Sequence, residues 1–94
     1  MARKAIPVDA PWSPPTLDEH EVRAIKALAA GKANEGQQIL AVQTIVNKIA
    51  QTYSLSFRAG EDGPRATDFA EGKRFVGDRI VRAINGPMPA PAKQ

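Results

Sequence analysis

The chain contains no cysteine, so the sequence excludes a disulfide framework, a thiolate metal site and a cysteine nucleophile. Its single histidine, His20, is flanked by acidic residues at Asp18, Glu19 and Glu21. Side chains at adjacent helix positions point in different directions, so this cluster does not match the geometry of a metal site. We therefore expect an exposed histidine and no bound metal.

Other catalytic signatures are missing as well. The stretch "GEDGPRAT" has glycines but lacks the Gly-Lys-Ser/Thr ending of a phosphate-binding loop. The serines and threonines have no candidate base other than His20, and paired carboxylates such as Asp68 and Glu71 need an enclosed pocket for acid–base work. The sequence predicts no enzyme activity and no cofactor.

Long apolar runs are also lacking. No stretch approaches the roughly 20 apolar residues of a membrane span, and no apolar run of signal-peptide length follows the basic N-terminus. We expect a protein that does not enter a membrane and is not exported. The net charge of +3 suits contact with nucleic acid or an acidic protein surface without selecting between them.

What the chain does have is helical periodicity between two proline-rich ends. Residues 1–15 contain four prolines and residues 87–94 alternate proline with small residues, so both are predicted to be extended arms. Residues 16–86 are predicted to form one small three-helix domain. The fold class is all-α.

The boundaries of the three helices follow from capping signals. The stretch "TLDE" predicts a capping box from Thr16 to Glu19, and Gly31 is placed to end the first helix. Asn34 is predicted to cap a second helix over residues 34–53, where the many β-branched residues also suit a strand but the length favours a helix. The third helix is predicted from residues 64–67 to Asn85.

The apolar residues of each helix follow one stripe and are predicted to form the core. In the second helix they are Ile39, Val42, Ile45, Val46 and Ile49, and in the third Phe69, Val76, Ile80, Ala83 and Ile84. Leu55 and Phe57 are expected to tie the intervening loop to this core.

The only tryptophan lies in the first arm, between prolines. A large amphipathic ring on an extended arm needs an apolar surface to cover it. Trp12 is predicted either to fold back on its own domain, which we favour, or to dock with Pro11 into a neighbouring subunit.

Two glycines, Gly72 and Gly77, lie inside the third helix, where each costs about 1 kcal/mol relative to alanine. Both fall on or beside the apolar stripe. We therefore predict close packing at these positions, with the second helix or with another subunit.

Basic residues also gather on the third helix, among them Arg74, Arg79 and Arg82. Arg79 and Arg82 share a face, but Asp78 interrupts the set. Solvated charge with some ion pairing is the favoured interpretation, and contact with nucleic acid or an acidic surface is the alternative.

The stretch "SLSFRAGEDGPRATDFAEGKRFVGDRIV" resembles a family of small proteins of short-tailed phages, encoded among packaging and virion genes. The resemblance spans about residues 17 to 86 and is most specific from 53 to 81. It is carried by Phe57, Arg58, Asp62, Arg65, Thr67, Phe69, Glu71, Gly72, Arg74, Phe75, Val76, Gly77, Ile80 and Val81. Asp78 departs from the pattern, because the family often has an apolar residue there, so a contact at this position is expected to be polar or absent.

The resemblance implies a structural or assembly role in the virion and carries over no catalytic residue. We expect an accessory protein near the portal and head-to-tail region, present in several symmetric copies, whose partner contacts include Pro11, Trp12, Phe57 and Arg58. The alternatives are a packaging or ejection factor that contacts DNA through Arg74, Arg79 and Arg82, and a host-directed regulator absent from particles.

Overall fold

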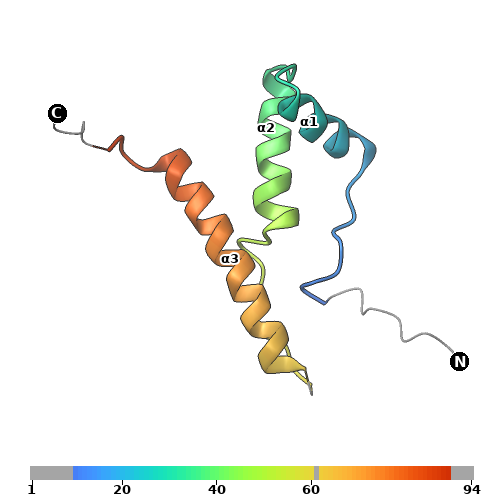
Figure 1. Cartoon of the computed structure of the whole chain (residues 1–94), viewed down its shortest axis with the longest axis vertical. Coiled ribbons are helices and arrows are strands. Elements are labelled where there is room, and N and C mark those ends of the chain that lie inside the picture. Colours follow the sequence, from blue (N-terminus) through green and yellow to red (C-terminus); the bar gives the residue numbers. More distant parts are fainter. Residues whose placement is uncertain (1–9, 61, 90–94) are drawn as a thin grey trace, which may run out of the picture.

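The computed structural model describes residues 10–60 and 62–89, and in this part of the chain the protein is all-α. Helices α1 (Glu19–Ala29) and α2 (Glu35–Thr44) form a hairpin, and α2 continues directly into a π-helical turn, η1 (Ile45–Ile49). After a loop, α3 (Gly63–Asn85) runs across the end of η1 (Figure 1). The predicted order of three helices is confirmed. The first nine residues and the last five, which belong to the predicted arms, lie outside the described residues.

Helix α1 begins later than predicted. Its N-cap is Asp18, whose carboxylate accepts a 2.9 Å hydrogen bond from the Glu21 backbone while the Glu21 carboxylate accepts one of 2.9 Å from the Asp18 backbone. The capping box predicted at Thr16 and Glu19 is therefore wrong. Asp is a better N-cap than Thr, and the Glu21 carboxylate also gains partners on the next helix.

Helix α2 begins at the predicted cap. The Asn34 side chain accepts from the Gln37 backbone at 2.8 Å and the Gln37 side chain accepts from the Asn34 backbone at 3.1 Å. Gly31, between the helices, has φ +71°, as expected of a residue that ends a helix. The helical backbone ends at Ile49, so the prediction that it reaches Tyr53 is wrong at that end.

The core is made of small side chains. Ala24 and Ala41 are fully buried between α1 and α2, and the other buried hydrophobic residues among those described are Val46, Ala50, Ala66 and Ala70. The predicted core of large apolar side chains is wrong for most of its members. Ile39, Phe69, Val76 and Ile84 are about half exposed, and Leu55 and Phe57 are more exposed still.

Helix α3 approaches the rest of the chain at Gly77, which is buried. A Cβ atom at this position would lie 1.7 Å from the Thr52 Oγ1 and 3.0 Å from the Ala50 Cβ. The predicted close packing is found here. At Gly72, by contrast, a Cβ would meet no atom within 4 Å, so close packing within the chain is wrong there, and a contact with another subunit stays a prediction.

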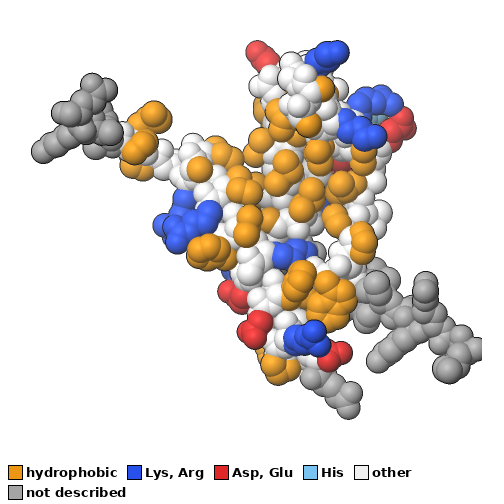
Figure 2. Space-filling view, viewed as in Figure 1, with side chains coloured by type: hydrophobic (Ala, Val, Ile, Leu, Met, Phe, Trp, Pro, Cys, Tyr) orange, Lys and Arg blue, Asp and Glu red, His pale blue; other side chains and the backbone are white. Residues whose placement is uncertain are grey.

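Among the described elements, the backbone of α3 comes within 8 Å, between Cα atoms, of η1 but not of α1 or α2. Figure 1 shows α3 crossing the lower end of the hairpin and diverging from it on both sides. Figure 2 shows that the hydrophobic side chains gather over α2 and over the middle and lower part of α3 on this face. Much of the apolar surface of the chain is thus left outside its own core.

Candidate interaction surface

Every aromatic side chain of the protein is substantially exposed. The exposed fractions are 40% for Trp12, 48% for Phe69, 57% for Phe75, 65% for Phe57 and 72% for Tyr53. Aromatic rings dominate the energetics of protein cores and of protein interfaces. Since these rings do not fill a core in this chain, they are candidates for an interface.

Trp12 folds back onto α3, as the favoured sequence interpretation predicts. Its ring meets Phe69 edge-to-face, with ring centroids 6.0 Å apart and planes at 83°. The neighbouring Pro11 is buried, and a hollow of about 380 Å³ lined by Trp12, Phe69, Asp62 and Arg65 opens beside the rings. The contact inside the chain covers only part of the aromatic pair, so docking into a neighbour stays open as well.

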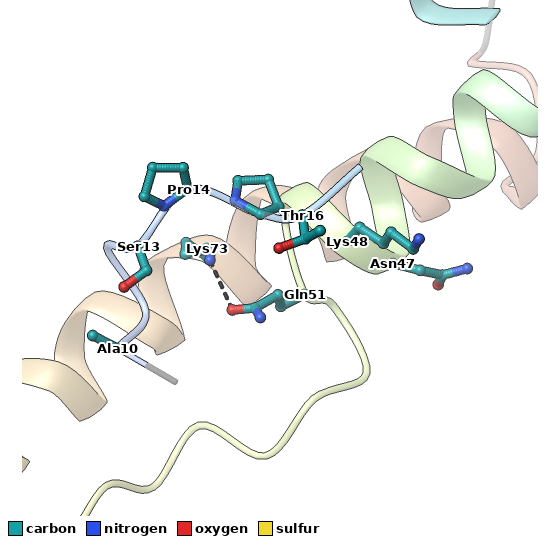
Figure 3. Close-up of a pocket in the computed structure, with 9 residues that line it drawn as sticks. Ala10, Ser13, Pro14, Thr16, Asn47, Lys48, Gln51 and Lys73 are labelled. Carbon is teal, nitrogen blue, oxygen red and sulfur yellow. Dashed lines mark hydrogen bonds between the residues drawn. The ribbon is translucent and has the colours of Figure 1, made fainter. Parts of the chain in front are cut away.

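Lys73 fixes the described part of the N-terminal segment on α3. Its Nζ donates to the Pro11 carbonyl at 2.8 Å and to the Gln51 Oε1 at 2.7 Å, the second bond being drawn in Figure 3. Burial lowers the pKa of Lys73, and the positive charge of Arg58 lowers it further. One ammonium group thus joins the N-terminal segment, the turn after η1 and α3, and positions Trp12.

The same figure shows a hollow between these three segments. It measures about 540 Å³. It is lined by Ala10, Pro14 and Pro15 and by the polar side chains of Ser13, Thr16, Asn47, Lys48, Gln51 and Lys73 (Figure 3). Both of its lysines are already engaged, because Lys48 pairs with Glu21 at 2.7 Å. The hollow therefore offers no ammonium group without a partner.

In the loop before α3, Phe57 is exposed and Arg58 forms hydrogen bonds within the loop. The Arg58 guanidinium donates to the carbonyls of Leu55 and Phe57, and the Arg58 backbone donates to the Thr67 hydroxyl at 2.9 Å. These bonds order the loop from within. Of the two predicted partner contacts in the loop, Phe57 points its apolar ring outward and Arg58 acts as a brace.

The basic residues of α3 are individually engaged. Arg74 donates to the Thr52 carbonyl at 3.1 Å and pairs with Glu71 at 2.8 Å. Arg82 pairs with Asp78 at 2.8 Å, and the Arg79 guanidinium carbon lies 4.8 Å from the centre of the Phe75 ring. This arrangement matches the favoured interpretation of solvated, partly paired charge. Asp78, where the resemblance fails, makes a polar contact.

The described residues hold no group of three His, Cys, Asp or Glu side chains that could bind a metal ion, and His20 is exposed. The pKa of Glu71 lies below its usual range because the Ser56 hydroxyl and then Arg74 bond its carboxylate.

Among residues 10–60 and 62–89, no helix is long and apolar enough to cross a membrane.

Sequence reasoning missed two residues that make long-range polar contacts in the fold. One is Lys73, whose ammonium group bonds Pro11 and Gln51. The other is the buried Glu21, whose carboxylate accepts from the Lys48 ammonium at 2.7 Å and from the Thr44 hydroxyl at 3.3 Å. A signal for Glu21 was present, because Asp18 and Glu21 have capping-box spacing. None was present for Lys73.

Comparison with known proteins adds no relative: no family model, curated protein or solved structure matches this chain.

Proposed function

We propose that this chain is a protein-docking subunit, an accessory structural component of a phage particle near the portal and head-to-tail region, present in several symmetric copies. One observation carries the docking role: every aromatic side chain is at least 40% exposed, and no large side chain is fully buried among the described residues. The phage context rests on the sequence resemblance over residues 53 to 81.

The exposed rings have the properties of interface anchors. Trp12 and Phe69 are held in place, by Lys73 on one side and by the helix on the other, so they are ordered before a partner arrives. Ordered aromatic anchors lose little conformational entropy on binding, and truncating one typically costs about 2 kcal/mol or more of binding free energy. In this proposal, neighbouring structural proteins cover Trp12, Phe57 and Phe69.

DNA contact is the competing function, and the arrangement of the charges does not favour it. Arg74 and Arg82 have carboxylate partners, and Arg79 lies over Phe75. Phosphate binding needs cations that are free to replace condensed counterions. The docking function therefore accounts for more of the surface than the DNA function does.

Mass spectrometry of purified particles, separated into heads and tails, tests the location. We expect the chain in the head-to-tail fraction, and its absence from particles would overturn the proposal in favour of a host-directed regulator. Particles assembled with Trp12→Ala should contain less of the chain. Particles assembled with both Arg79→Ala and Arg82→Ala should contain the normal amount, and loss only in the arginine variant would favour DNA contact.

A further inference from the structure

The buried stripe of α3 continues past its contact with η1. Gly63, Ala70, Gly77 and Ile84 are seven residues apart and therefore share one face of the helix. The first three are buried, whereas Ile84 is 57% exposed. The face of α3 that carries these buried small residues is thus uncovered in the last third of the helix.

The facing stripe of α2 shows the same gradient. Val46, in η1, is 6% exposed, Val42 is 36% exposed and Ile39 is 60% exposed. These three residues have helical spacing and lie away from Ala41 and Thr44, which are buried against α1. Val46, at the crossing, is therefore covered, whereas Val42 and Ile39 farther along α2 and Ile84 farther along α3 are not.

We call the space between these stripes the α2–α3 notch. Its walls are aliphatic and carry no charge; they are formed by Ile39, Val42 and Ile49 on one side and by Ile80, Val81 and Ile84 on the other. No Cα atom of α3 lies within 8 Å of one in α2, and the two helices diverge above their crossing (Figure 1). Ile39 and Ile84, one on each wall, are 60% and 57% exposed, so the described part of the chain leaves both largely uncovered.

We infer that the α2–α3 notch is the contact surface of a twofold-symmetric dimer, in which the last third of α3 of each copy lies in the notch of the other. This inference deepens the proposed function, since it names one of the contacts by which several copies assemble.

The area of the notch fits a second copy. Ile39 and Ile84 are 60% and 57% exposed, Val42 and Ile49 are 36% and 38% exposed, and Ile80 and Val81 are partly exposed, so the six side chains together expose on the order of 400 Å² of apolar surface. One side of a standard-size interface buries about 800 Å², of which roughly 60% is apolar, or about 480 Å². The notch thus supplies most of the apolar surface that one partner of a stable dimer contributes.

Self-complementarity also favours a second copy over a different protein. The notch needs an aliphatic helix stripe to fill it, and the same chain carries one at Val81 and Ile84. The helix stripe and the notch that receives it lie on the same surface of the chain. Both contacts between two copies therefore form at once, and the assembly closes at two copies. The aromatic rings of Phe57 and Phe75 are not used in this contact and stay free for other neighbours.

Sedimentation equilibrium of the full chain, over micromolar to submillimolar concentrations, tests the inference. We expect a reversible dimer for the natural sequence and at least 100-fold weaker association for Ile84→Asp. The matched control is Phe75→Asp, because Phe75 is also 57% exposed on α3 but lies on another face. The control should dimerise normally, and circular dichroism should show that all variants keep their helices.

A second variant tests whether Ile84→Asp prevents association only by damaging α3. Ile39→Lys, on the opposite wall, should also be monomeric. Mixing it with Ile84→Asp should restore a dimer, because the aspartate on α3 of one copy then meets the lysine in the notch of the other copy. Restoration supports the inference, and failure to restore a dimer overturns it.

Two other outcomes overturn the inference. One is a natural chain that is monomeric at every concentration, in which case loss of Ile84→Asp from particles would assign the notch to a neighbour of different sequence. The other is equal loss of dimer in Phe75→Asp. A dimer in solution whose chain is absent from particles would instead refute the proposed function and leave the inference intact.

Discussion

The α1–α2 hairpin and α3 are stabilised in different ways. Both hairpin helices begin with a reciprocal capping box, and a buried carboxylate, Glu21, joins them through Thr44 and Lys48. Helix α3 is longer, but its N-cap residue Asp62 makes no side-chain capping bond, and its close contact with the turn after η1 lies at the small residue Gly77.

This difference shows where the chain keeps its capacity for binding. The hairpin satisfies its own polar groups and buries fully its facing alanines, Ala24 and Ala41. Helix α3 uses glycine and alanine for its internal contact and leaves Phe69, Phe75 and Ile84 about half exposed. A small-residue contact lets α3 approach η1 closely while its large side chains stay available.

The strongest way to break this arrangement is to fill the close approach. Gly77→Ala places a Cβ 1.7 Å from the Thr52 Oγ1, which itself bonds the Val46 carbonyl at 2.8 Å. We expect a loss of about 1 to 3 kcal/mol in the free energy of unfolding, measured by urea denaturation, because Thr52 cannot move without losing that bond.

The matched control is Gly72→Ala on the same helix, where the added Cβ meets no atom within 4 Å. This change should stabilise the chain by up to about 1 kcal/mol through helix propensity alone. Equal effects of the two substitutions would show that Gly77 has no special packing role. The double variant Gly77→Ala with Thr52→Ala should recover part of the loss.

The second test addresses the polar centre of the hairpin through pH. The Lys48 ammonium and then the Asp18 backbone bond the Glu21 carboxylate and hold its pKa below the usual value of 4.5. A lowered folded-state pKa gives stability that is present above about pH 4.5 and is lost as the pH falls through the folded-state pKa.

Stability should therefore decline on acidification, and Glu21→Gln should flatten that decline while lowering stability at neutral pH. The comparison variant is Glu71→Gln on α3, whose carboxylate is about half exposed and should contribute less. A urea midpoint for Glu21→Gln that follows the natural chain at every pH would contradict a polar tie between α1 and α2.

The sequence predicted the features that local chemistry determines. Asn34 as a cap, Gly31 as a left-handed turn and the stop after Asn85 all depend on residues within one turn of each other. The close approach at Gly77 was also predictable, because an internal glycine on an apolar stripe is costly without a packing reason.

Contacts between residues far apart in the chain could not be predicted from the sequence in the same way. Helical spacing identifies Ile39 and Val42 as one stripe but does not say whether that stripe meets its own chain or another. Lys73 finds its acceptors 62 and 22 residues away along the sequence, at Pro11 and Gln51. Periodicity reports which residues share a face, and only the tertiary arrangement reports what covers it.

The third test separates the N-terminal segment from α3. Lys73→Ala removes two hydrogen bonds that position Pro11 and Trp12, and we expect a loss of about 1 to 2 kcal/mol in stability. Because Trp12 is the only tryptophan, its fluorescence emission should shift to the red as the ring leaves Phe69. The exposed Lys32→Ala serves as control and should change neither quantity.

The smallest effect is expected from the charges on the exposed side of α3. The side chains of Arg82 and Asp78 are 73% and 51% exposed, and such i,i+4 pairs typically contribute about 0.3 to 0.5 kcal/mol. The contact of Arg79 with the half-exposed Phe75 ring contributes a similar amount, about 0.5 kcal/mol. Changing both arginines to alanine should therefore lower the free energy of unfolding by no more than about 1 kcal/mol, measured by urea denaturation.

The same double variant sharpens the distinction between docking and DNA contact. If α3 reserves its apolar side chains for partners and its charges only for solubility, the natural chain should show no tight binding to duplex DNA, and the variant should behave alike. A filter-binding titration across salt concentrations measures this. Tight binding by the natural chain that falls steeply with salt, and that disappears with Arg79 and Arg82, would make the charged face of α3 its functional surface, because only phosphate contacts release counterions in this way.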